Sequence, residues 1–347
     1  MRNYFSSVFI LLTVITLLTA QCSPVRYHGP KLSYFDGKIF KNSGPINEKG
    51  FSDFLSWVLF ETKTKWPEQL QNTPYPPPSA DVSEYEMQVT FINHASFLIQ
   101  IGGLNILTDP QYSERASPFT WAGPKRVRLP GVAFEDLPKI DVVLISHDHY
   151  DHLDIMTLEK LKVRDDPLIL SGLGVDDILQ KESTILSTTS LPWWQAHKSG
   201  EVNFHFVPAQ HFSSRWINDR FASLWGGFVI NYRNTQIFFA GDTGYSNHFK
   251  QIQNKFPKTD LALIPIGAYE PRWFMKDMHV NPDEAVLAHL DLKAKQSIGM
   301  HFGTFQLTNE GIDEPAKALL IALKKYRVKS SDFLVPDFGQ SWRWVLN

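Results

Sequence analysis

At 347 residues, the chain is long enough to bury one large core or two ordinary ones. Its composition, 43% hydrophobic and 20% charged residues, is typical of a globular protein. The formal net charge of -2 and the lack of any basic block give no electrostatic reason for nucleic-acid binding, so we expect no nucleic-acid partner.

The first twenty residues differ from the rest of the chain. Arg2 is followed by an uncharged stretch over 5–20, which is typical of a secretory signal or a membrane anchor. The single cysteine, Cys22, cannot form an internal disulfide, and its position favours lipid attachment as in bacterial lipoproteins. Gln21 departs from the small residue usual before a lipoprotein cysteine, so simple cleavage and an uncleaved anchor stay open. We expect 1–22 to be a signal peptide or anchor, and the protein to be exported, either periplasmic or membrane-anchored.

Residues 23–86 are expected to form an N-terminal extension. Gly, Pro and Lys over 23–50 indicate an extended surface segment. Apolar residues at helical spacing over 51–66 predict an amphipathic helix. Its polar face carries both acidic and basic residues, so we expect it to pack on the core and not on a membrane. The proline-rich run 74–78 predicts a linker that is neither helix nor central strand.

Residues 87–347 are expected to form one catalytic domain, because no linker divides them. Short β runs at 87–93, 97–101 and 105–108 are separated by turn residues. Farther along, apolar strand-like runs alternate with helical stretches. The apolar runs are 142–145, 202–207, 228–230, 237–239 and 261–264, and the helical stretches are 155–163, 282–290 and 315–326. This order predicts an α/β fold of mixed sheets with helices outside.

The apolar run ending at Ile145 leads directly into a cluster of polar residues. Three histidines and two aspartates occur within 147–152. Protonated imidazoles would repel one another, and buried neutral ones need partners, whereas a divalent cation binds both imidazole and carboxylate. Residues two apart in an extended segment point the same way, so His147 and His149 can bind one ion. Asp151 and His152, beyond the turn, can face a second.

Further candidate ligands follow other apolar strands. His211 comes after 202–207, Asp242 after 237–239, and His301 after 296–300. Sites in open α/β sheets form at the carboxyl ends of strands, so these segments are expected to converge. Alone, each histidine would more often be a core residue and the aspartate a turn residue. Together with the 147–152 cluster, they predict a site for two metal ions.

The order of these ligands, His-x-His-x-Asp-His followed by His211, Asp242 and His301, resembles the metallo-β-lactamase superfamily. A closer resemblance covers most of 87–305 and is to the N-acylphosphatidylethanolamine-hydrolysing phospholipase D family. It rests on NHASFLI at 93–99, TDP at 108–110, GPKR at 123–126, PIGAYEPRWFM at 265–275, HVNPDEA at 279–285 and MHFGTF at 300–305. The string at 34–37 and the following helix resemble bacterial members.

The resemblance implies an αββα sandwich of two mixed β-sheets flanked by helices, and two zinc ions or other divalent metals. His147, His149 and His211 would hold the first ion. Asp151, His152 and His301 would hold the second, and Asp242 would bridge the two. Residues that match Tyr150 and His279 contact the substrate in that family.

Two more polar residues, His94 and Asp109, lie near the expected site. Asp109 is expected either to orient a metal-bound histidine or to be an ordinary turn residue. His94 is expected to support the site or to be structural. Where the animal enzyme has a second tyrosine after the ligand loop, Ile155 stands here, which leaves headgroup recognition open.

The expected reaction is hydrolysis of a phosphodiester in a phospholipid-like substrate, of the phospholipase D type. A hydroxide bridging the two ions would attack phosphorus, while His279 would hydrogen-bond the phosphate. The resemblance and the export signal together favour membrane association, and the oligomeric state stays open. The alternative is a lactonase or sugar-phosphate hydrolase on the same fold.

Three other classes of protein are disfavoured. Diiron redox proteins on this scaffold typically have a carboxylate where His149 stands. A nuclease would show a basic patch or an inserted second domain, and neither is visible in the sequence. A degenerate binding module would lack some ligands, whereas all seven expected positions are filled here.

Overall fold

The computed structural model describes residues 26–216 and 218–346. The signal or anchor expected over 1–22 therefore lies outside the described residues, and export stays a prediction. Within the described part of the chain, no helix has both the length and the apolar character needed to cross a membrane.

Two seven-stranded sheets form the centre of the described chain. The first has the strand order β14-β1-β2-β3-β4-β5-β6, and the second has the order β13-β12-β11-β10-β9-β8-β7. The strands of the first sheet are β1 (Glu86–Asn93), β2 (Ser96–Ile101), β3 (Leu104–Thr108), β4 (Val142–Leu144), β5 (Leu168–Gly172), β6 (Thr189–Leu191) and β14 (Ser341–Val345). Those of the second are β7 (Ala196–Ser199), β8 (Val202–Val207), β9 (Gly227–Tyr232), β10 (Thr235–Phe239), β11 (Leu261–Pro265), β12 (Gln296–Met300) and β13 (Phe333–Leu334).

Both sheets are mixed, and their parallel strands share one direction within each sheet. In the first sheet, β3 to β6 run parallel, while β1, β2 and β14 pair antiparallel. In the second, β10 to β13 run parallel, and β7, β8 and β9 form antiparallel pairs. Because β8 and β10 both pair antiparallel with β9, they end at the same edge.

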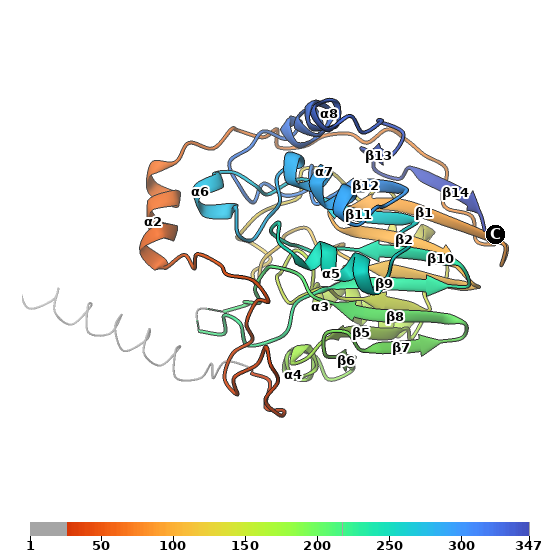
Figure 1. Cartoon of the computed structure of the whole chain (residues 1–347). Helices are drawn as coiled ribbons and strands as arrows, with labels where there is room; N and C mark the ends of the chain where they lie inside the picture. Colours follow the sequence, from red (N-terminus) through yellow and green to blue (C-terminus); the bar gives the residue numbers. More distant parts are fainter. Residues whose placement is uncertain (1–25, 217, 347) are drawn as a thin grey trace, which may run out of the picture.

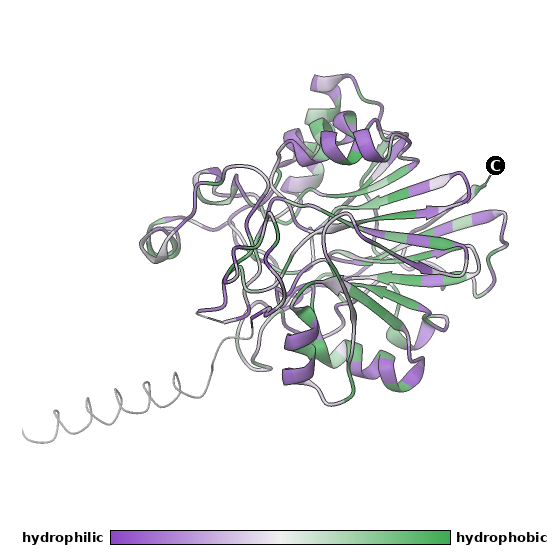
Figure 2. Cartoon of the chain, turned by 60° about the horizontal axis from the view of Figure 1, so that its bottom comes forward, coloured by the Kyte–Doolittle hydropathy of each residue, from purple (hydrophilic) through white to green (hydrophobic). Residues whose placement is uncertain are grey.

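Helices cover the outer faces of the two sheets (Figure 1). They are α3 (Ile155–Arg164) and α4 (Val175–Glu182) on the first sheet, and α5 (His248–Lys255), α7 (Pro282–Asp291) and α8 (Glu314–Tyr326) on the second, with η1 (Phe134–Asp136) and α6 (Arg272–Met275) in loops. The helices are hydrophobic toward the sheets and hydrophilic outward (Figure 2). The result is the expected αββα sandwich.

Most predicted elements are confirmed, because each combines a buried apolar run with turn or capping residues at its ends. Strand β1 is an example: from Met87 to Asn93 every residue is buried. Helix α7 is capped by Asn281, whose side chain accepts from the Glu284 N–H in a capping box, with Pro282 in the first turn. The prediction missed the short strands β5, β6, β7, β13 and β14, which carry little periodicity of their own.

The prediction for the helix near residue 51 is wrong in two respects. Helix α2 spans Phe51–Phe60 and does not extend to residue 66. The apolar side chains of Val58, Leu59 and Phe60 do not lie on the core, since they are 47%, 67% and 82% exposed. Trp57 faces inward, where its indole N–H donates to Asn309 Oδ1 at 2.9 Å. In Figure 1, α2 stands beside α6, apart from the sheets.

The segment before α2 was predicted to lie on the surface, but part of it is buried. Phe35 and Phe40 are buried in the main core, their rings 4.5 Å apart. The Trp66 indole after α2 donates to the Glu310 backbone carbonyl. Tertiary contacts therefore attach this part of the chain to the two-sheet body.

The burial of the sheets predicts the cost of truncating a core ring. Phe239→Ala in β10, where the side chain is fully buried, is expected to lower the free energy of unfolding by about 3–5 kcal/mol. Chemical denaturation would measure the change. Phe60→Ala is the matched control because that ring is exposed, and it should stay within about 0.5 kcal/mol of the unmodified protein. Equal losses in both variants would contradict this assignment of the core.

Candidate metal centre

The predicted ligands lie just past the ends of four strands at one edge of the sandwich. His147 follows β4, His211 follows β8, Asp242 follows β10 and His301 follows β12. The turn before Asp242 requires a glycine: Gly241 has φ +60°, and a Cβ there would lie 2.6 Å from the Ser146 Cβ. This close approach brings the end of β10 against the end of β4.

One group of four side chains gathers around His149. Its Nδ1 lies 2.9 Å from His147 Nε2 and 3.3 Å from His211 Nε2. Asp242 Oδ2 lies 4.0 Å from His147 Nε2 and 3.8 Å from His211 Nε2. Three imidazole nitrogens and one carboxylate oxygen therefore converge on one point.

A second group forms on the other side of Asp242. His301 Nε2 lies 3.0 Å from Asp242 Oδ2 and 3.3 Å from Asp151 Oδ2. His152 Nε2 lies 3.2 Å from Asp242 Oδ2 and 3.4 Å from Asp151 Oδ2. Asp242 Oδ2 is thus common to both groups, as expected for a bridging ligand. The structure brings together all seven predicted side chains, which we call the metal-ligand cluster.

The donor set of the cluster fits divalent cations. Imidazole nitrogen and carboxylate oxygen are the preferred ligands of zinc and related metals. The donor atoms of His147, His149, His211 and Asp242 lie within 4.8 Å of one another, and so do those of Asp151, His152 and His301 together with His94. Asp242 Oδ1 is buried and has no hydrogen-bond partner among the described residues, so this carboxylate oxygen can still accept a bond.

The histidines of the cluster differ in pKa, because burial and neighbouring charges affect them to different extents. Burial lowers the pKa of His147 and His211 well below the usual value, and that of His149 to about 4. These rings are therefore neutral, as a metal ligand must be. Burial also opposes protonation of His301, but the carboxylates of Asp242 and Asp151 outweigh it and raise its pKa to about 9. A cation at that position would replace the proton.

Several of the predicted ligand histidines form hydrogen bonds through Nδ1, the ring nitrogen that faces away from the cluster. Asp109, predicted as a possible orienting residue, lies with Oδ2 2.6 Å from His152 Nδ1 and accepts from the Ser146 hydroxyl. The Ser146 hydroxyl in turn lies 2.8 Å from His147 Nδ1. His211 Nδ1 lies 2.9 Å from the Met278 carbonyl oxygen. Such contacts fix the ring orientation and the tautomer of a ligating histidine.

His94 also contacts the cluster. Its Nε2 lies 2.9 Å from Asp151 Oδ2, and its backbone carbonyl accepts from the His301 N–H. Both His94 and His301 have left-handed backbone conformations, with φ of +45° and +62°. Such conformations are uncommon outside glycine and concentrate at functional sites.

The two predicted substrate contacts lie in different places. His279 Nδ1 is 3.8 Å from Asp242 Oδ2 and has no hydrogen-bond partner among the described residues, so it faces the cluster. Burial lowers its pKa to about 4. The Tyr150 ring, in contrast, lies 4.0 Å below the Arg215 guanidinium and lines a different cavity. A role of Tyr150 in substrate binding stays a prediction.

Sequence reasoning missed two residues that hold the ligand loops. The buried Arg215 donates from Nη1 to the Asp148 and Leu153 carbonyls at 2.8 and 3.0 Å, and pairs with Glu182. It therefore spans the loop that carries three of the predicted ligands. Asn42 accepts from the His211 N–H and donates to its carbonyl. No local motif marks either residue, because their partners are distant in the chain.

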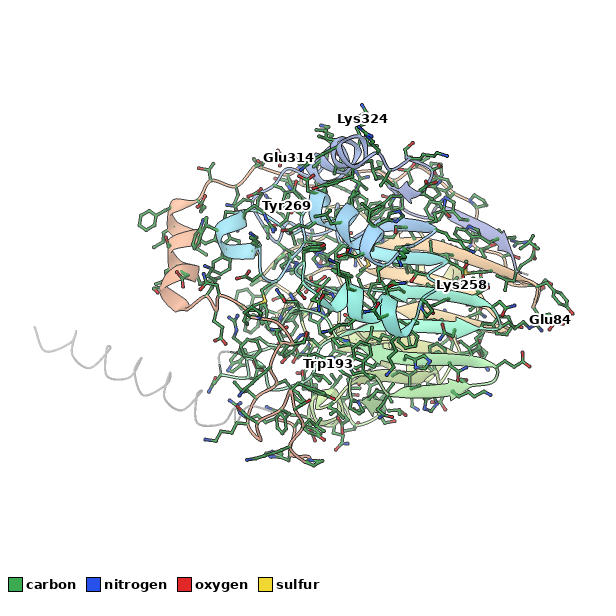
Figure 3. The ribbon with its side chains drawn as sticks, in the orientation of Figure 1. Glu84, Trp193, Lys258, Tyr269, Glu314 and Lys324 are labelled. Atoms are coloured by element: carbon green, nitrogen blue, oxygen red, sulfur yellow. The ribbon has the colours of Figure 1, made fainter. Side chains whose placement is uncertain are left out.

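A cavity of about 490 Å³ opens from the cluster toward α2. Among its lining residues are His149, Asp151, Asp242, His279, Lys49 and Arg220, with apolar walls from Phe54, Trp57, Phe212, Phe274, Met275 and Met278. Figure 3 places Tyr269 near α6, on the side of the molecule where α2 stands, and Glu84 at the far end of the strands. The apolar walls suit a hydrocarbon chain.

Comparison with known proteins identifies the family. Residues 104–302 match the β-lactamase superfamily domain. The N-acyl-phosphatidylethanolamine-hydrolyzing phospholipase D 1 of Caenorhabditis elegans is 34% identical over an alignment of 337 residues, which covers 88% of this chain and 93% of that protein. The chain belongs to this family. It is therefore a hydrolase of the metallo-β-lactamase superfamily.

Two further relatives agree with this assignment. The mitochondrial N-acyl-phosphatidylethanolamine-hydrolyzing phospholipase D of Saccharomyces cerevisiae is 38% identical over 225 residues, covering 62% of this chain and 47% of that protein. Igni18, a metallo hydrolase from Ignicoccus hospitalis, has a TM-score of 0.57 at 19% identity, and the match covers 76% of this chain and all of that one. The latter likeness concerns the fold alone.

The contact between Asp109 and His152 predicts a loss of metal affinity. In Asp109→Asn, an amide N–H can replace the oxygen that faces His152 Nδ1, so the ring loses its orientation. Zinc affinity, measured by competition with a chelator, should fall about 10- to 100-fold.

Asp260→Asn is the control for this variant. Like Asp109, Asp260 accepts hydrogen bonds, one from the Gln236 backbone N–H and one from the Lys295 side chain. It lies at the start of β11, away from the cluster. The variant should leave zinc affinity unchanged. Unaltered affinity in Asp109→Asn would show that His152 does not depend on this carboxylate.

Proposed function

We propose that the protein is a dinuclear metal-dependent phosphodiesterase that cleaves N-acylphosphatidylethanolamine-like lipids in the manner of a phospholipase D. The observation that carries the proposal is the position of Asp242 Oδ2, which lies between two groups of imidazole and carboxylate ligands at the end of an apolar cavity. Family membership supports the substrate class, since the C. elegans relative is named for this hydrolysis.

Two zinc ions are the proposed cofactors. His147, His149 and His211 would hold one, Asp151, His152 and His301 the other, and Asp242 would contact both. When bound, such ions lower the pKa of water toward neutrality and offset the charge that grows on phosphoryl oxygens. The chain itself supplies the fixed geometry of the ligands, through Asp109, Ser146 and the backbone.

His279 is the proposed phosphate contact among the side chains that are not ligands. Its ring is neutral at physiological pH because burial lowers its pKa to about 4. With the proton on Nδ1, the ring can donate to a phosphoryl oxygen beside Asp242, since this nitrogen has no partner among the described residues. Arg272 donates to the His279 carbonyl at 2.8 Å and so holds the residue in place. In the proposed hydrolysis the oxygen of water bonds to phosphorus, the bond between phosphorus and the ethanolamine oxygen breaks, and a proton from water passes to that oxygen, so that a phosphatidic acid and an N-acylethanolamine leave.

The proposed lipid surface contact is the outer side of α2. Val58, Leu59 and Phe60 are exposed there, while Phe54 and Trp57 of the same helix line the cavity. Trp273, whose indole donates to Glu61, adds another partly exposed ring beside the helix. A lipid entering from a membrane would thus meet apolar surface on its way to the cluster.

The function is tested by offering three substrates to the metal-loaded protein. Vesicles with N-acylphosphatidylethanolamine and soluble bis(p-nitrophenyl) phosphate should be hydrolysed, and an acyl lactone should not. Removal of metal by a chelator should abolish turnover, and zinc should restore it. Asp242→Ala should lower kcat by at least about 100-fold and reduce the bound metal, because both groups lose a shared ligand.

Asp277→Ala is the control, because this aspartate lines the same cavity but accepts from the Asn47 backbone N–H and is not a member of the cluster. It should retain two metal ions. Full activity with two bound ions in Asp242→Ala would contradict the proposed centre, and preferential turnover of the lactone would favour a lactonase.

The surface contact is tested by vesicle sedimentation. The double variant Leu59→Ser and Phe60→Ser should bind phospholipid vesicles at least about tenfold more weakly, because it removes exposed apolar area. Its turnover of soluble bis(p-nitrophenyl) phosphate should not change. Leu320→Ser with Ile321→Ser, a pair 48% and 68% exposed on α8, is the control and should bind like the original. Equal weakening by both pairs would refute a specific role for α2.

A further inference from the structure

Two cationic residues, Arg220 and Lys49, contribute to the wall of the cavity. Arg220 donates from Nη1 to the Lys49 carbonyl at 3.5 Å, and both residues line the cavity that contains His149 and Asp242. The Arg220 guanidinium carbon lies 4.4 Å from the centre of the Phe212 ring. Lys49 Nζ lies 5.8 Å from the centre of the Trp273 ring. We call these two residues the Arg220–Lys49 pair.

Neither member of the pair forms an ion pair with a carboxylate in the part of the chain that the structure describes. Arg220 Nε is buried and has no hydrogen-bond partner there. The other arginines near the site differ, since Arg215 pairs with Glu182 at 2.9 Å and Arg272 with Glu284 at 2.7 Å. The Arg220–Lys49 pair therefore has positive charge that the protein itself does not balance at contact distance.

Two of the acidic groups nearby are engaged elsewhere. Asp219, the preceding residue, accepts from the backbone N–H groups of Arg215 and Trp216. Asp277 accepts from the Asn47 N–H at 2.9 Å. Burial lowers the pKa of Arg220, and Glu48 opposes this effect without forming an ion pair. Two positive charges in the wall of one cavity, neither with a carboxylate at contact distance, favour an anion as the ligand of that cavity.

The pair is one aromatic ring away from the metal-ligand cluster. The Phe212 ring that contacts Arg220 also lies 4.5 Å from the His149 ring, centre to centre. A ligand that occupies the cavity can therefore reach both places. An oxyanion at Arg220 would accept a charge-assisted hydrogen bond from the guanidinium, whose Nε–H has no partner among the described residues.

We propose that the Arg220–Lys49 pair is an oxyanion-binding subsite, which holds a phosphate oxygen of the substrate and disfavours headgroups that carry an ammonium. The proposal rests on the proposed hydrolysis of a phosphodiester at this cavity. N-acylation of an ethanolamine headgroup removes its positive charge, so the phosphodiester is left with a net negative charge. The pair would favour that form over the unacylated zwitterion.

The test is steady-state kinetics of the full, metal-loaded chain with two monomeric short-chain lipids. One is an N-acylated phosphatidylethanolamine, and the other is the same lipid without the N-acyl group. Arg220→Gln should raise KM for the acylated lipid about tenfold, with kcat changed less than about threefold, because it removes one charge-assisted contact. The preference for the acylated lipid should shrink by the same factor.

Three more variants test whether the change in KM comes from the charge of the side chain or from a structural effect of the substitution. Arg220→Lys retains the charge and should recover part of the loss in KM. Lys49→Gln should lower the preference in the same direction. Arg128→Gln is the matched control, since Arg128 also lies over a ring, that of Phe338, and has a buried Nε without a partner, but it does not line the cavity. It should leave KM for both lipids unchanged.

The outcomes distinguish the subsite from the proposed function. An unchanged KM in folded Arg220→Gln, or equal losses for both lipids, overturns the subsite. If Arg220→Gln does not fold, the same two criteria are applied to the KM values of Arg220→Lys and Lys49→Gln. If the original protein hydrolyses neither lipid, the proposed function fails. The subsite is then decided by binding of the acylated lipid, measured through tryptophan fluorescence. Weaker binding in the variants supports it, and equal binding refutes it.

Discussion

A single carboxylate oxygen, Asp242 Oδ2, lies within 4.0 Å of four buried histidines of the cluster. Imidazole and carboxylate lone pairs that converge in a buried site repel one another unless positive charge lies between them. Divalent cations satisfy this requirement with the donor atoms that are present. The edge where β4, β8, β10 and β12 end is arranged around this requirement.

The sandwich keeps these ligands in place with contacts that lie behind them. Asp109 and Ser146 hold His152 and His147 through the ring nitrogens that face away from the cluster. Arg215 holds the 148–153 loop by two backbone carbonyls. The rigid strands and these hydrogen bonds fix the ligand geometry before any substrate enters, which is the condition for efficient metal-assisted hydrolysis.

The N-terminal part of the chain adds the features that would act on a lipid. Helix α2 presents apolar side chains outward and closes one side of the cavity with Trp57. Lys49, just before the helix, lies next to Arg220 from a loop about 170 residues later in the chain. Apolar walls and unbalanced positive charge therefore meet in one cavity, a combination suited to an anionic amphiphile.

The sequence by itself determined the metal-ligand cluster and the central strands, because both depend on local patterns. The histidines and aspartates directly follow buried apolar runs, and strands of one direction end at one edge of a sheet. Only the tertiary structure decided the outward direction of α2, the placement of Tyr150 against Arg215, and the pairing of Arg220 with Lys49. These features depend on which distant segments pack together, and no periodicity or spacing along the chain records that choice.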